Sequence, residues 1–204
     1  MAFLSERDRR EIAQAIAAAE ARTSGELVAV VARAADHYLY IPLLWAALVA
    51  LTLPGPLLLF GDLRADAIYA IQVIVFLVLA LVFNLTPLKM RLIPRAVQQA
   101  RVHRLALAQF VEQNLHATAG RSGVLIFVSV AERHVEILAD RGINARVPAG
   151  TWERVVAEFT ARLRAGRVGE GFVQAVNTCG ELLAGHFPAA PGDRNELPDR
   201  LIEL

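Results

Sequence analysis

Two carboxylates stand shortly after the two runs of the sequence that are most typical of buried strands. Asp36 follows the apolar run Leu27–Val31, and Glu132 follows the run Val124–Val128. In open α/β sheets, ligands bind beyond the carboxyl ends of parallel strands, so both side chains are predicted at that edge. Oxygen ligands suit hard divalent cations, and this pair would take calcium or magnesium. The alternative interpretation is two solvated turn carboxylates, with Glu132 and Arg133 capping a hairpin.

Basic side chains suggest a second kind of chemistry, the recognition of phosphate. Arg133 lies at the same predicted edge, and its planar guanidinium can contact a lipid phosphate or a membrane partner. Five basic residues without an acidic neighbour form a run: Lys89, Arg91, Arg95, Arg101 and Arg104. Such a run is expected to lie against anionic lipid headgroups. The whole chain has 21 basic and 20 acidic residues, which argues against a dedicated nucleic-acid binder.

No familiar catalytic motif accompanies these residues. The sequence contains no G-x-G-x-x-G, P-loop, H-E-x-x-H or G-x-S-x-G pattern. Its five histidines lack the spacing of metal ligands. The single cysteine, Cys179, lies in an apolar helical pattern and is predicted to be a buried structural thiol. The residues alone therefore favour a protein that is not an enzyme, with no catalytic residue assigned and no cofactor required.

Two long uncharged stretches, Ile41–Gly61 and Ala67–Leu88, have 21 and 22 residues. Each is long enough to cross a bilayer as a helix, and a short polar turn lies between them. We therefore predict a transmembrane helical hairpin over residues 41–88, where 35 of 48 residues are apolar. Pro54 and Pro56 are expected to kink its first helix. The alternative, a buried hairpin in a soluble core, would need an apolar shell that the other 156 residues cannot provide.

The distribution of basic residues predicts the orientation of this hairpin. Seven basic residues flank it, namely Arg22, Arg33 and the five residues of the basic run, whereas Arg64 alone lies in its turn. Cytoplasmic loops carry an excess of lysine and arginine, so both termini are predicted in the cytoplasm. The expected localisation is the inner, or plasma, membrane, with two passes and a cytoplasmic soluble domain.

The rest of the chain alternates between helical and strand patterns. A capping pattern at Ser5 opens a predicted helix that runs to about Arg22, and a helix around Leu107–Leu115 precedes the second strand. A third strand at Val135–Ala139 should pair antiparallel with the second, and two more helices follow, the first from Pro148. This order predicts an α/β fold: an α/β/α sandwich with a small mixed sheet, interrupted by the hairpin.

The same order divides the chain into three parts. Residues 1–40 and 89–187 are predicted to form one split domain, and residues 41–88 form the hairpin. Residues 188–204, which mix proline, glycine and charge, are predicted to be an irregular tail. Because the first strand is needed between helices that would otherwise expose apolar faces, both parts of the domain should fold as one unit.

The strand-forming segments resemble a known family. Two blocks of the chain are similar to the TPM domain. The segments that carry the similarity are Leu4-Ser5, Thr23–Val31, Gly123–Ser129, Glu132-Arg133 and Val135–Ile137. That family groups thylakoid-lumen proteins of photosystem II repair, a nematode receptor-accessory protein and many bacterial membrane-anchored proteins. Some members are described as weak, metal-dependent acid phosphatases. The resemblance implies an α/β/α sandwich and a role in maintaining or assisting membrane complexes.

The chain departs from the usual form of this family in two places. Usual members follow a signal peptide and carry any membrane helix after the domain, whereas the predicted hairpin is internal. Many members have acidic residues just before the second strand, where this sequence has Gly120-Arg121-Ser122. We therefore expect a non-catalytic accessory or scaffold protein of a membrane complex, whose partners are membrane lipids and an integral-membrane protein. The alternative is a weak metal-dependent phosphohydrolase that binds a divalent cation such as calcium.

Overall fold

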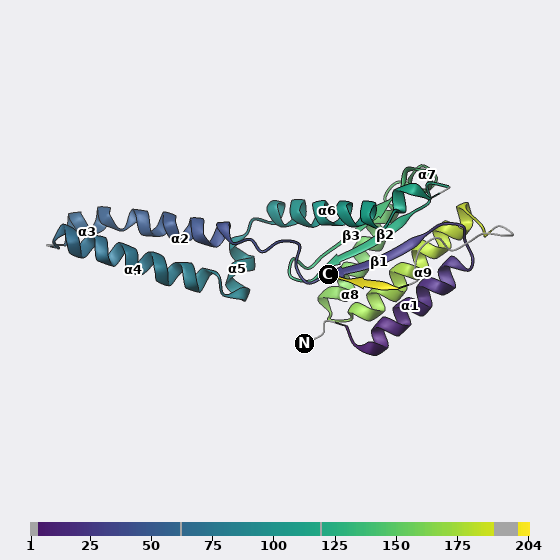
Figure 1. Ribbon diagram of the computed structural model, residues 1–204, viewed down its shortest axis with the longest axis horizontal. Helices are drawn as coiled ribbons and strands as arrows, with labels where there is room; N and C mark the ends of the chain where they lie inside the picture. The colour runs from purple at the N-terminus through teal and green to yellow at the C-terminus, as the bar shows by residue number, and fades with distance from the viewer. Residues whose placement is uncertain (1–3, 62, 119, 190–199) are drawn as a thin grey trace. The chain divides into compact units, whose positions relative to one another are not determined.

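The chain forms two compact units in the computed structural model, which describes residues 4–61, 63–118, 120–189 and 200–204. The first unit comprises residues 1–35 and 99–204, and the second comprises residues 36–98. Figure 1 shows a sheet with covering helices in the first unit and a helical hairpin in the second.

A four-stranded mixed sheet of order β3-β2-β1-β4 organises the first unit. β1 (Leu27–Ala32) pairs in parallel with β2 (Val124–Ser129) and with β4 (Leu201–Glu203). β2 pairs antiparallel with β3 (His134–Ala139), as predicted. Every residue of β1 and β2 is buried, which explains why both strands are continuous apolar runs in the sequence.

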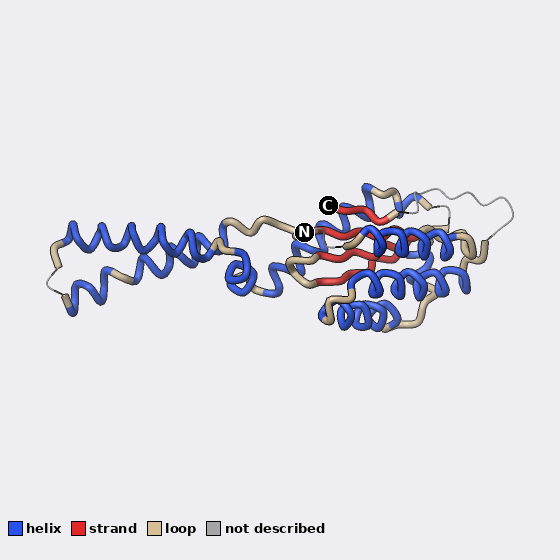
Figure 2. Tube along the Cα trace, turned by 90° about the horizontal axis from the view of Figure 1, so that it is seen from below, coloured by secondary structure: helices blue, strands red, loops and turns tan. Residues whose placement is uncertain are grey.

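Helices cover both faces of this sheet (Figure 2). They are α1 (Glu6–Glu20), α8 (Thr151–Arg164) and α9 (Val168–His186) on one face, and α6 (Arg95–Glu112) on the other. The odd-numbered residues of β1 pack in the core on the first face, and its even-numbered residues pack in the core on the second. The predicted α/β/α sandwich is confirmed.

The first helix begins at the predicted cap. The Asp8 N–H donates to Ser5 Oγ at 3.1 Å, and the Ser5 N–H donates to Asp8 Oδ2 at 2.9 Å. These reciprocal bonds satisfy donors that the first turn of a helix leaves without partners. Hydrogen bonds from the Ser5 hydroxyl and the Ser5 N–H lower the pKa of Asp8. Two residues three positions apart in the sequence therefore determine where α1 begins.

The core of the first face contains the single cysteine. Cys179 is fully buried, as predicted, and burial raises the pKa of its thiol to about 12. The thiol is therefore neutral near pH 7, and it lacks the thiolate character that a nucleophile or metal ligand needs. Phe159 and Phe172 belong to the same core and pack edge to face, with ring centroids 4.9 Å apart.

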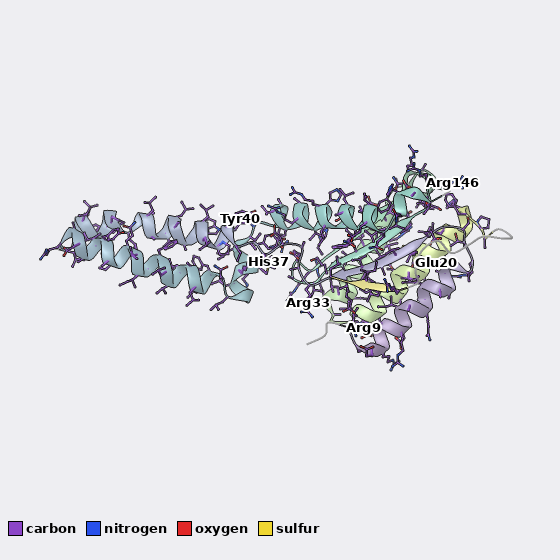
Figure 3. The ribbon with its side chains drawn as sticks, viewed as in Figure 1. Arg9, Glu20, Arg33, His37, Tyr40 and Arg146 are labelled. Atoms are coloured by element: carbon purple, nitrogen blue, oxygen red, sulfur yellow. The ribbon has the colours of Figure 1, made fainter. Side chains whose placement is uncertain are left out.

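The C-terminal segment differs from the prediction of an irregular tail. Residues 201–203 form the edge strand β4, while residues 190–199 lie outside the described part of the chain. Leu201 packs against one core and Ile202 against the other. Arg9 of α1, labelled in Figure 3, donates through Nε and Nη2 to the two carboxylate oxygens of Glu203, at 2.5 and 3.2 Å. Three residues are too few to show a strand period, so this strand depends on partners distant in the sequence.

Two shorter elements and one helix boundary also differ from expectation. η1 (Leu115–Ala117) and α7 (Arg141–Asn144) were not predicted. α8 begins at Thr151 instead of Pro148. Gly150 adopts a left-handed conformation (φ 83°), which is not helical, so the helix can begin only after it.

Two apolar helical segments make up most of the second unit. The first consists of α2 (Tyr40–Thr52) and α3 (Pro54–Phe60), and the second is α4 (Ala65–Phe83). Each is long and apolar enough to cross a membrane, and α2 packs against α4. Only 11% and 6% of their most apolar windows are buried. A core helix of a soluble protein would be mostly buried, so the alternative of a hairpin inside a soluble core does not describe them.

The boundaries of these helices follow the sequence only in part. The first segment is interrupted at Leu53, immediately before Pro54, where the prolines predict a kink. The second was predicted to reach Leu88, but α4 ends at Phe83 and a separate helix, α5, follows (Thr86–Leu92). Asn84 ends α4: its Nδ2 donates to the carbonyl of Ala80 at 2.8 Å.

Candidate functional site

Glu132 lies in the turn between β2 and β3, where its carboxylate is used by the fold. Its Oε1 accepts a hydrogen bond from the Ala35 N–H at 3.0 Å, and its Oε2 accepts one from the hydroxyl of Ser129. Ser129 is the last residue of β2 and is fully buried. The Val130 N–H also donates to the carbonyl of Ala32 at 3.0 Å. Glu132 therefore joins the end of β2 to the loop that follows β1.

Asp36, the other carboxylate predicted at this edge, belongs to the second unit. Its Oδ1 accepts a hydrogen bond from the Tyr38 N–H at 3.2 Å. Tyr38 is buried and has a positive φ of 48°, which is uncommon for a residue other than glycine. The Asp36 carboxylate thus supports the turn that leads into α2.

The donor set can be compared with the needs of a hard cation. Calcium takes six to eight oxygen ligands and magnesium takes six. Both carboxylate oxygens of Glu132 already accept hydrogen bonds from the chain. Among the residues that the structure describes, no group of three or more His, Cys, Asp and Glu side chains could hold a metal ion. Asp36 and Glu132 by themselves do not meet the coordination that calcium or magnesium requires.

Arg133 is exposed in the same turn. Its backbone is left-handed (φ 50°), and its N–H donates to the carbonyl of Val130 at 3.2 Å. Of the three charged residues predicted at this edge, Arg133 is the exposed one, since Asp36 and Glu132 are partly buried. The turn therefore presents a guanidinium group to solvent or to a partner.

The predicted basic run is divided between the two units. Lys89 and Arg91 lie on α5 and Arg95 begins α6, all in the second unit. Arg101 and Arg104 lie further along α6, in the first unit. The five residues of the run therefore belong to two different units.

A polar cluster at the opposite end of the sheet was missed by the sequence reasoning. The Asp140 N–H donates to the carbonyl of Gly123 at 2.9 Å, and Asp140 Oδ2 lies 3.9 Å from Arg121 Nη1. A carboxylate thus does reach the loop before β2, but it comes from the end of β3. Gly142 allows this approach, because a Cβ there would lie 2.4 Å from the carbonyl oxygen of Gly120. The sequence Asp140-Arg141-Gly142 directly after a strand, with a helix-capping residue and a glycine, was the available signal.

A second missed contact joins α6 to β3. His103 Nδ1 forms a hydrogen bond with Glu136 Oε1, and the other carboxylate oxygen of Glu136 is buried. The His103 side chain is half exposed. The two residues are 33 positions apart, so no local pattern announces the pair.

The part of the chain that contains the turn between β2 and β3 and the Asp140 cluster is similar to a known protein family. The family model of the TPM domain matches residues 90–182. The TPM match runs from α5 into α9, and it includes β2, β3, Glu132, Arg133 and Asp140. The first of the two resembling blocks, with α1 and β1, lies outside it.

Comparison with whole proteins identifies a solved structure with a similar fold. No curated protein matches the chain. The NMR structure of the BA42 protein from the psychrophilic bacterium Bizionia argentinensis is similar, with a TM-score of 0.61. The similarity covers 99% of this chain and 96% of that chain at 20% sequence identity. Identity this low shows a shared fold alone, so the site must be interpreted from its own residues.

Proposed function

We propose that this chain is a membrane-anchored accessory protein without catalytic activity, whose α/β domain binds an integral-membrane protein on the cytoplasmic side. The observation that carries the proposal is the pair of apolar helical segments, whose most apolar windows are 11% and 6% buried. Exposed apolar surface of this extent is unstable in water and stable in a bilayer.

The hydrogen bonds of the Glu132 carboxylate support a role without catalysis. A metal ligand or general base must be able to turn toward its ion or proton, whereas hydrogen bonds to both oxygens orient this carboxylate within the domain. Arg133 remains exposed beside it, and a guanidinium suits recognition of an acidic partner. The turn between β2 and β3 is therefore the proposed contact surface.

The anchor and its orientation are tested by reporter fusions. A reporter active only outside the cytoplasm should be active in the turn between α3 and α4, and a cytoplasmic reporter should be active at the C-terminus. The reason is the distribution of seven flanking basic residues against Arg64 in the turn. An exported, active reporter at the C-terminus would show that the topology is the opposite of the one proposed. Release of the chain from membranes by alkaline carbonate would show that the two apolar segments do not span the membrane.

The partner surface is tested by photo-crosslinking in intact membranes. A photoreactive residue in place of Arg133 should give one crosslinked product that contains an integral-membrane protein. The matched control is the same substitution at Arg154, an exposed arginine of α8, which should give no such product. Equal crosslinking from both positions would show that the turn between β2 and β3 is not the contact surface.

A chromogenic phosphate ester provides the corresponding test of catalysis. The purified chain is expected to leave it intact at acid pH, with or without calcium. Calcium-dependent hydrolysis would identify the chain as a phosphohydrolase and contradict the accessory role.

A further inference from the structure

A short helix, α5, lies at the open end of the hairpin, where it contacts both α2 and α4. The Trp45 Nε1–H of α2 donates to the carbonyl of Leu92 at 3.3 Å. Gln98 Nε2 donates to the carbonyls of Met90 and Ile93, at 2.9 and 3.1 Å. The last carbonyls of a helix have no partner within it, so these side chains satisfy α5 and hold its C-terminal end in place.

A small core supports the same region. Tyr38, Ile41 and Ile93 are buried together, and Met90 and Val97 pack against them. We call these five residues the collar. Because the collar joins the entry of α2 to the end of α5 and the start of α6, the side chains that α5 presents outward are held on an ordered support.

The charge of this region has one sign. Lys89, Arg91 and Arg95 lie on α5 and at the start of α6, and Arg91 and Arg95 are exposed. The sequence has no Asp or Glu between Asp66 and Glu112. None of the three basic residues forms an ion pair with any residue that the structure describes. Their charge is therefore not neutralised by the described part of the chain.

Aromatic side chains mark the same end of the hairpin. Tyr40, labelled in Figure 3, is 51% exposed, and Trp45 is 43% exposed. Tyrosine and tryptophan are enriched where a membrane protein crosses from hydrocarbon to headgroups, because one end of each ring system is apolar and the other is polar. Their positions place the end of the hairpin that carries α5 at the headgroup level.

We infer that Lys89, Arg91 and Arg95 form a binding site for the phosphate groups of anionic lipids. The inference rests on the proposed membrane anchor and names its lipid partner. Arginine binds phosphate through a planar pair of N–H donors, and lysine contributes a point charge. The site continues into the exposed apolar surface of α2 and α4, against which acyl chains can pack. A soluble phosphate lacks those chains, so the occupant is a lipid.

The test uses the full chain reconstituted into phosphatidylcholine vesicles that contain a trace of spin-labelled lipid. The association constant of labelled phosphatidylglycerol relative to labelled phosphatidylcholine is measured by electron paramagnetic resonance. The wild-type ratio should be severalfold above one, since a basic residue near an anionic surface contributes about 1 kcal/mol, or roughly fivefold. In the triple variant K89Q/R91Q/R95Q the ratio should approach one. Salt at about 1 M should lower the wild-type ratio, because it reduces the Debye length to about 3 Å.

A matched triple variant separates the site from total charge. R141Q/R154Q/R164Q removes the same charge from exposed arginines of α7 and α8 and should keep the wild-type ratio. If K89Q/R91Q/R95Q does not reconstitute, the single variant R91Q and the salt series on the wild type give the result. A wild-type ratio of one, or equal losses in both triple variants, overturns the inference while leaving the anchor intact. Extraction of the wild-type chain by alkaline carbonate instead overturns the anchor itself.

Discussion

A fragment that begins at Gln99 is expected to remain unfolded, whereas residues 1–35 joined to residues 99–204 by a flexible linker should melt as one cooperative domain. The fragment lacks α1 and β1. β1 is central, lying between β2 and β4, and all six of its residues are buried. Without it, β2 loses its parallel partner, and α9 loses both α1 and a strand against which it packs. The expected effect is loss of the whole fold.

Circular dichroism and differential scanning calorimetry on both proteins provide the measurement. A glycine-serine linker of about 20 residues, which is a flexible coil with an end-to-end distance of roughly 25 Å, replaces the second unit. The joined protein serves as the control for the fragment, because every residue of the fragment is also present in it. Cooperative melting of the fragment alone would show that the segment matched by the TPM model folds independently of β1. Two separate transitions in the joined protein would contradict a single split domain.

Glu132→Ala is expected to lower the free energy of unfolding by about 2–4 kcal/mol. The change removes the acceptor of the Ala35 N–H and of the Ser129 hydroxyl. Ser129 is fully buried, so its hydroxyl would be left without the bond that compensates its desolvation. Glu132→Gln keeps one carbonyl acceptor and should cost less, about 1 kcal/mol. Denaturant titration of the full chain in mild detergent provides the measurement.

Glu181→Ala is the matched control, since Glu181 is an exposed glutamate of α9. Its effect should lie within about 0.5 kcal/mol. The same titrations with calcium distinguish a structural carboxylate from a metal ligand. A bound cation at 100 times its dissociation constant would stabilise the wild type by about 2.7 kcal/mol, and the Glu132 variants would lose that gain. We expect no stabilisation by calcium. A calcium-dependent rise in stability that Glu132→Gln abolishes would support the predicted metal site.

Several elements could be read directly from the sequence because their causes are local. Leu27–Val31 and Val124–Val128 are strands buried on both faces, and such strands leave no position for a polar residue. The start of α1 depends on Ser5 and Asp8, three positions apart. Cys179 lies on an apolar helical face, and its burial follows from that face. Each of these predictions used a pattern that is contained within a single helix or strand.

The elements that were missed depend on contacts between distant residues. β4 has three residues, and its position depends on the free edge of β1 and on Arg9, which lies 194 positions from Glu203. The position of α5 depends on its contacts with α2, which lies before α4 in the chain. Neither cause produces a repeating pattern that a short window of sequence can reveal.

The sequence by itself determined the layers of this protein and its two apolar helical segments, because burial on one or both faces imposes a hydrophobic period along the chain. Only the tertiary structure decided which polar side chains support the fold and which remain exposed. The place of Glu132 after a strand makes it a candidate ligand, and the structure adds that its carboxylate accepts a hydrogen bond from Ala35, 97 positions away. Asp140 was passed over, yet the pairing of β2 with β3 brings it to Arg121. Hydrogen bonds act over about 3 Å in space at any separation in sequence, so the chemistry of a carboxylate is decided only when the chain has folded.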